Sequence, residues 1–219
     1  TGFGGGDGIV TQAIGTGDDE AYAVALQADG KILVAGRTVN ATFFDFAVLR
    51  YTADGLLDTT FGGGDGIVIT DFGASSNDTV SAVLVQSDGK IVVGGTSAND
   101  FAVARYLSDG TLDTSFSGDG KQTLDIATAN DEGRGLALQT DGKIVQAGTG
   151  FVGGVQNFAL VRYNADGSVD TGFGGGDGIV TTAISTDWNI AQAVEVQSDG
   201  KIVVGGYSRG LSDNDFTIV

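Results

Sequence analysis

The sequence predicts an all-β protein, a β-propeller made of four-stranded antiparallel blades, and three observations support this prediction. A complex series of motifs recurs four times in the same order. Each recurrence contains four short apolar runs separated by turn residues, which is typical of short antiparallel strands. Glycine supplies 38 of the 219 residues while 41% of the residues are hydrophobic, so the chain combines many tight turns with a core.

Four motifs define the repeat, which is roughly 55–60 residues long. Phe-Gly-Gly-Gly-Asp-Gly-Ile-Val begins at residues 3, 61 and 173, and a shorter variant begins at residue 116. Gln-x-Asp-Gly-Lys begins at residues 27, 86, 139 and 197. (Asp/Asn)-Phe-Ala-(Val/Leu)-x-Arg-Tyr has its phenylalanine at residues 46, 101 and 158, with a shortened copy at 216. Asp-Gly-x-(Leu/Val)-Asp-Thr begins at residues 54, 109 and 166. The four motifs together divide a single domain into repeats of approximately 1–58, 59–113, 114–170 and 171–219.

The character of the apolar runs orders the strands within a blade. The runs at 31–37 and 44–51 are apolar on both faces, so we expect them to be the buried middle strands. The run at 20–27 carries a small residue four positions before its glutamine, which suits the crowded innermost strand. The run at 66–71 then forms the outer strand, and Asp-Gly pairs supply the hairpin turns. A solenoid is the main competing architecture, but four-stranded units with Asp-Gly hairpins favour a propeller blade.

The two ends of the chain predict how the last blade is completed. Residues 8–14 read as an outer strand, whereas residues 215–219 read as a third strand, so the fourth repeat lacks an outer strand of its own. We expect the N-terminal strand to complete the last blade by pairing with 215–219, because an unpaired edge exposes N–H and C=O groups. One chain would then close a four-bladed ring, or two chains would form an eight-bladed homodimer. An arc of a longer ring is the third alternative.

Taken together, the four motifs resemble the delta-60 repeat family of bacterial proteins over essentially the whole chain. The resemblance implies a propeller without an assigned biochemical role, often within large secreted or surface-associated proteins. Family members often carry proline before the Asp-Gly-Lys turn, where this sequence has Ala28, Ser87, Thr140 and Ser198. The family offers no catalytic residues to carry over. The resemblance to this family implies that the protein is secreted or lies on the cell surface.

Composition narrows the classes of function. The 28 acidic residues outnumber the 11 basic residues to give a net charge of −17, which repels phosphate backbones and argues against a nucleic-acid partner. Histidine and cysteine are absent, so the common nucleophile–base pairs cannot form, and we expect no catalytic residues and no enzyme. No apolar run approaches a membrane span. No cofactor is expected; Ca²⁺ is the one candidate, although no loop has the spacing of a known calcium motif.

Charged residues that recur in every repeat are interpreted as scaffold. Each third strand carries an arginine just before its tyrosine, and a charge in that position needs a partner. The aspartates of the Leu/Val-Asp-Thr segment are the obvious partners. We therefore predict the pairs Arg50–Asp58, Arg105–Asp113 and Arg162–Asp170.

Departures from the repeat point to a binding site. The loops between the second and third strands, and those between consecutive repeats, vary and should share one face, while the uniform Asp-Gly turns occupy the other. Trp188, the only tryptophan, stands where other repeats have Asp18, Asn77 and Asn130. With Asp187, Tyr207 and Arg209 it forms the predicted ligand site, since aromatic faces stack on sugars and arginine donates a fork of hydrogen bonds. The predicted function is a binding or adhesion module for a glycan or a surface protein. The alternative is a purely structural repeat domain with no ligand, and a domain stabilised by cations is a third hypothesis.

Overall fold

The computed structural model describes residues 2–40, 42–73, 75–127, 130–210 and 213–219. The first blade contains β1 (Asp19–Leu26), β2 (Ile32–Asn40), β3 (Phe43–Tyr51) and β4 (Ile67–Thr70). The second contains β5 (Asp78–Val85), β6 (Ile91–Ser97), β7 (Asp100–Tyr106) and β8 (Lys121–Leu124). The third contains β9 (Glu132–Leu138), β10 (Ile144–Val152), β11 (Val155–Tyr163) and β12 (Ile179–Thr182). The fourth contains β13 (Asn189–Val196), β14 (Ile202–Arg209) and β15 (Asn214–Ile218).

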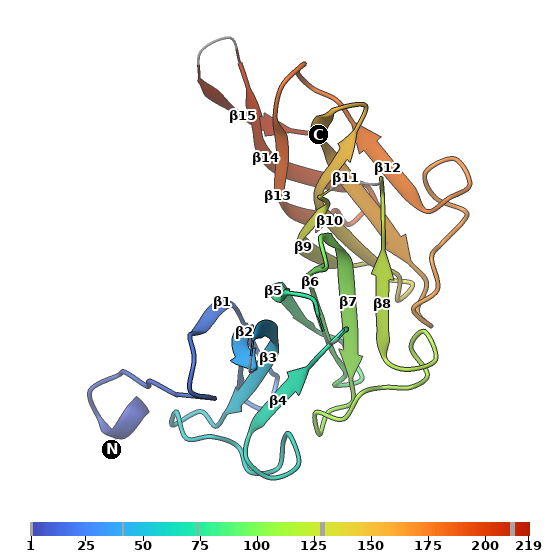
Figure 1. Cartoon of the computed structure of the whole chain (residues 1–219). Coiled ribbons are helices and arrows are strands. Elements are labelled where there is room, and N and C mark those ends of the chain that lie inside the picture. The colour runs from blue at the N-terminus through green and yellow to red at the C-terminus, as the bar shows by residue number, and fades with distance from the viewer. Residues whose placement is uncertain (1, 41, 74, 128–129, 211–212) are drawn as a thin grey trace.

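The blades follow one another along an arc that runs from the N-terminus to the C-terminus (Figure 1). Within each blade the strands pair antiparallel in chain order. The first strand of each blade contacts the first strand of the next, from β1 through β5 and β9 to β13, so these strands are innermost. The predicted all-β propeller architecture and strand order are therefore confirmed. No helix in the described ranges is both long and apolar enough to traverse a bilayer.

The core lies between neighbouring blades. Phe46 and Val48 on β3 share one buried cluster with Ile91, Val93 and Ala104 on β6 and β7 of the next blade. Both faces of the middle strands are thus covered, which explains why their sequences are apolar without alternation. Burial of these side chains from two blades at once makes each blade depend on its neighbours for stability.

A bulge interrupts every innermost strand at the same position. The pairing between first and second strands skips one residue in each blade, namely Tyr22, Ser81, Arg134 and Gln192. Opposite the bulge the second strand carries a glycine. A Cβ on Gly148 would lie 1.9 Å from the carbonyl oxygen of Glu132, so the close approach of the two backbones requires glycine here. Gly36, Gly95 and Gly206 occupy the same place in the other blades.

The predicted arginine–aspartate pairs are present in all three repeats. The Nε–Oδ2 distance is 2.7 Å for Arg50–Asp58, 2.8 Å for Arg105–Asp113 and 2.7 Å for Arg162–Asp170. A lysine from the Asp-Gly-Lys turn also reaches each carboxylate, at 3.1, 3.4 and 2.9 Å in the same order. Arg50 and Arg105 also donate to backbone carbonyls of the next blade, those of Ser108 and Ala165. The pairs therefore tie consecutive blades together.

Within this one chain, the N-terminal segment does not complete the last blade, contrary to the prediction for closure of a four-bladed ring. Residues 8–14 form no strand, and β15 pairs only with β14, so the fourth sheet has three strands among the described residues. The two ends of the chain lie far apart in Figure 1. The N-terminal segment is instead held on the first blade, where Phe3 and Val10 pack against the turn at Gly55 and Gly4 N–H donates to the Asp54 carbonyl at 3.0 Å. These local contacts keep the segment at its own end of the arc.

Candidate functional site

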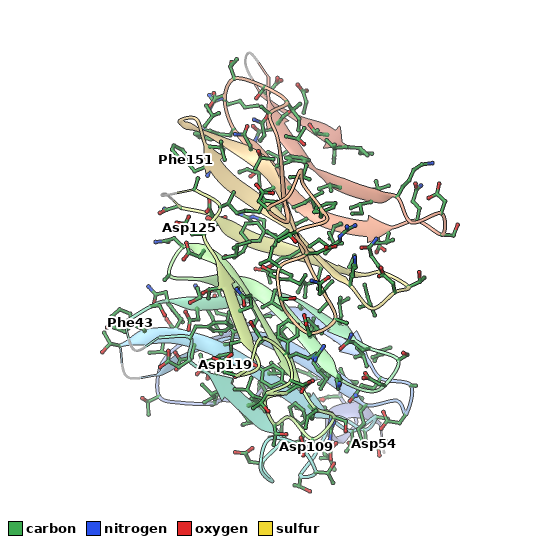
Figure 2. The ribbon with its side chains drawn as sticks, turned by 90° about the vertical axis from the view of Figure 1, so that its right-hand side faces the viewer. Phe43, Asp54, Asp109, Asp119, Asp125 and Phe151 are labelled. Carbon is green, nitrogen blue, oxygen red and sulfur yellow. The ribbon has the colours of Figure 1, made fainter. Side chains whose placement is uncertain are left out.

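The variable loops meet on one face, as the sequence predicts. The Phe44 N–H at the start of β3 donates to the Asn77 side chain, which lies in the link to the next blade. The Asp131 N–H likewise donates to the Asn99 carbonyl in the β6–β7 hairpin. Figure 2 shows Phe43, Asp125 and Phe151 along one side of the molecule, and the Asp-Gly turns at Asp54 and Asp109 lie away from that side. The irregular residues therefore share one surface, the variable-loop face.

Three of the four predicted site residues come together at the fourth blade. The Arg209 guanidinium lies over the Trp188 ring, 4.9 Å from its centroid, and pairs with Asp187 at 3.4 Å. The Arg209 N–H also donates to the Trp188 carbonyl at 2.7 Å, which fixes the loop against the end of β14. Trp188 remains 49% exposed. The cluster therefore presents a supported aromatic ring to solvent.

Tyr207 is directed elsewhere. It lies on β14 two residues before Arg209 and lines a mainly apolar hollow of about 590 Å³ together with Phe216 and Ile218 of β15. This hollow belongs to the end face of the fourth blade. The structure thus brings Asp187, Trp188 and Arg209 into contact and leaves Tyr207 beside them on the end face.

A polar cavity of about 510 Å³, which was not predicted from the sequence, opens near the axis. The bulge residues of all four blades line it, together with Asn77, Asn99 and Glu132. Arg134 pairs with Glu132 and donates from Nη1 to Gln192 at 3.4 Å. The bulge residue varies from Tyr22 to Arg134, whereas the residue after it is small in all four blades, and this variation was the available signal.

Two clusters of aspartates lie between blades on the variable-loop face. In each cluster the carboxylate oxygens of three residues lie within 4.8 Å of one another: Asp45, Asp71 and Asp78 between the first two blades, and Asp100, Asp125 and Asp131 between the second and third. Burial, followed by the negative charges of Asp125 and Asp131, raises the pKa of Asp100. Oxygen ligands at this spacing suit a hard cation such as Ca²⁺.

The equivalent position between the third and fourth blades is neutral. Asn157 and Asn189 replace two of the three aspartates, and Asn189 Nδ2 approaches Asn157 Oδ1 at 3.5 Å and donates to the Gln156 carbonyl at 2.9 Å. The Asn157 amide in turn donates to the Val152 carbonyl at 3.1 Å, so neutral side chains bonded to the backbone occupy this position. The same interface between blades is therefore acidic twice in this chain and neutral once.

Comparison with known proteins identifies the repeat. The family described as "Domain of unknown function (DUF5122) beta-propeller" matches residues 27–61, 86–116, 139–173 and 197–219, together more than half of the chain. The chain belongs to this family. A solved structure of a protein of unknown function from Bacteroides caccae is similar, with a TM-score of 0.52 and 12% sequence identity. The match covers 91% of this chain and 60% of that chain, and it supports the fold alone. No curated protein matches the chain.

Proposed function

We propose that this propeller domain is a non-enzymatic binding module of a secreted or surface-associated bacterial protein with repeats of the delta-60 type. Its ligand, a glycan, would bind on the variable-loop face. The exposed Trp188 ring, held in place by Arg209, is the observation that carries this proposal. A buried tryptophan would suit a cap on the blade, whereas a half-exposed ring on a charged support offers a stacking platform.

The surrounding charges define the class of glycan. Arg209 can donate to sugar hydroxyls and Asp187 can accept from them, so the cluster offers both kinds of hydrogen bond beside the ring. Tyr207 would extend the contact along β14. The net charge of −17 repels sulfated and sialylated chains over distances of about 10 Å at 0.1 M salt. We therefore propose a neutral glycan.

A glycan array of neutral and acidic sugars, followed by titration of any hit, tests the proposal. Trp188→Ala should abolish binding, because the stacking surface is lost. Tyr22→Ala is the matched control, since Tyr22 is another aromatic side chain that is 49% exposed but lies on the innermost strand of the first blade. Loss of binding in Arg134→Ala with Trp188→Ala unaffected would place the ligand in the axis cavity and refute Trp188 as its contact.

The second candidate is a structural module stabilised by Ca²⁺, which the two aspartate clusters favour. Calcium should raise the melting temperature of the wild-type domain, and chelation should lower it. The double variant Asp71→Asn/Asp125→Asn changes an exposed member of each cluster and should remove the response to calcium. Asp18→Asn/Glu195→Gln removes the same amount of charge outside the clusters and should leave the response intact. A calcium response of equal size in both double variants would contradict this role.

A further inference from the structure

The bulge on each innermost strand takes one side chain per blade out of the β-ladder, and these four side chains line the axis cavity. Bulges re-aim side chains and are over-represented next to active sites. The scaffold residues of this repeat are the same from blade to blade, but the bulge residues share no chemistry: they are Tyr22, Ser81, Arg134 and Gln192. Variation at equivalent positions around one cavity indicates a binding role rather than a scaffold role.

The axis cavity opens on the variable-loop face, which also carries Trp188. Asn77 lies in the link between the first two blades and Asn99 lies in the β6–β7 hairpin, and both residues line the cavity of about 510 Å³. Glu132, the first residue of β9, lines the same cavity. A ligand bound on the variable-loop face can therefore enter the cavity.

The lining of the axis cavity carries no net charge, although the chain has a net charge of −17. Glu132 and Arg134 are the only charged residues in the lining, and they pair with each other. The remaining side chains of the lining are amides and hydroxyls. Amides and hydroxyls both donate and accept hydrogen bonds, as sugar hydroxyls do. The lining therefore favours a neutral, polyhydroxylated ligand over an ion.

Arg134 is bonded differently from the scaffold arginines. Arg105 uses all three guanidinium nitrogens in hydrogen bonds within the protein. Arg134 pairs with Glu132 through Nη2, reaches Gln192 only at 3.4 Å through Nη1, and has no partner for its Nε among the described residues. Its side chain is 32% exposed. Arg134 therefore keeps Nη–H donors for a ligand, beside a carboxylate that can accept.

Trp188 and the axis cavity lie at the two ends of one short stretch of the chain. Trp188 immediately precedes β13, and Gln192 is the bulge residue of that strand. Four residues of extended strand span about 13 Å. Residues 189–191, which lie between them, are buried, so none of their side chains stands between the two positions. An oligosaccharide of a few residues covers this span.

We propose that the axis cavity is a second subsite for the neutral glycan, which stacks one sugar on Trp188 and extends along β13 into the cavity. There Arg134 donates to one sugar hydroxyl, Glu132 accepts from the neighbouring hydroxyl, and the Gln192 amide bonds a third. Tyr22 is engaged within the first blade and is not part of this contact. The inference rests on the proposed function, because Trp188 anchors the chain of sugars.

A comparison of short and long oligosaccharides by isothermal titration calorimetry tests this subsite. The probes are the disaccharide and the hexasaccharide of the malto-, cello-, manno- and xylo-series, and of any further neutral series that the glycan array identifies. The wild type should bind the hexasaccharide of the recognised series about tenfold more tightly than the disaccharide, because the longer chain adds hydrogen bonds to a charged pair. Arg134→Gln should lose this gain and keep the affinity for the disaccharide. Arg37→Gln is the matched control, since Arg37 also pairs with a glutamate, Glu20 at 2.8 Å, but does not line the cavity.

The outcomes separate this inference from the proposed function. Equal affinity of the wild type for both lengths, or a length gain that survives Arg134→Gln, would overturn the axis subsite and leave the Trp188 site standing. Loss of the gain in Arg37→Gln as well would indicate a general effect of charge and would also overturn the subsite. If the wild type binds no neutral glycan, or if Trp188→Ala binds the disaccharide as the wild type does, the proposed function fails and the inference fails with it.

Discussion

The substitution Arg105→Ala would remove the centre of a buried network that joins the second blade to the third. Arg105 pairs with Asp113 at 2.8 Å, donates to Ser115 at 3.3 Å and to the Ala165 carbonyl of the next blade, and lies over the Phe116 ring at 4.7 Å. The side chains of Arg105 and Asp113 are only 5% and 6% exposed. Alanine would leave the carboxylate buried without its main partner.

The size of the effect follows from this burial. Removing one partner of a buried ion pair destabilises a protein by about 3–5 kcal/mol. Lys90 remains 3.4 Å from the Asp113 carboxylate and retains part of the compensation, so we expect the lower end of that range. With a urea dependence of about 2 kcal/mol per molar, the unfolding midpoint should fall by about 1.5 M. Urea titration at pH 7, followed by far-ultraviolet circular dichroism, measures it.

Arg162→Ala is the matched control. Arg162 pairs with Asp170 at 2.7 Å, but its side chain is 19% exposed, and among the described residues its guanidinium donates only to Asp170. Solvent screening and the missing contact to a next blade should reduce the loss to about 1–2 kcal/mol. If Arg105→Ala unfolds at the wild-type midpoint, the network is unimportant. If both variants lose the same amount, the contact between blades is not the cause.

Three further measurements probe the same scaffold. Burial tends to raise the pKa of Asp113, but hydrogen bonds from Ser115 and the charges of Arg105 and Lys90 outweigh burial and lower the pKa to about 2. The stability that this carboxylate provides should therefore be lost as the pH falls from about 4 to about 2. Urea midpoints measured from pH 7 to 2.5 should show this loss, and Asp113→Asn should flatten the pH dependence. Asp100 has a raised pKa, so its negative charge destabilises the folded protein at pH 7. Asp100→Asn should therefore raise the urea midpoint at pH 7 in the presence of a chelator. An unchanged or lower midpoint would contradict the repulsion from Asp125 and Asp131. Gly148→Ala should lower the melting temperature sharply, at a cost of about 3 kcal/mol or more, because its Cβ has no space, whereas Gly205→Ala, which meets nothing within 4 Å, should be neutral.

The fold could be predicted from the sequence because its determinants are local and repeated. Asp-Gly pairs fix the hairpins, and the apolar character of 31–37 and 44–51 identifies the buried middle strands. The Arg105–Asp113 pair could be predicted as well, since a charge on a buried strand needs a partner and the aspartate lies eight residues away. The lysine that joins the pair was not predicted, because its contact depends on how the inner hairpin folds over the outer turn.

The axis cavity and the aspartate clusters depend on contacts that no local pattern specifies. Asp45 lies on β3, Asp71 follows the end of β4, and Asp78 begins β5 of the next blade. Only the stacking of two blades brings their oxygens together. The lining of the axis cavity likewise depends on a bulge, which shifts Arg134 out of the ladder. The N-terminal segment does not pair with β15 within this chain, and the sequence could not decide between a closed ring and an arc because sequence phase alone cannot say how far apart the two ends lie.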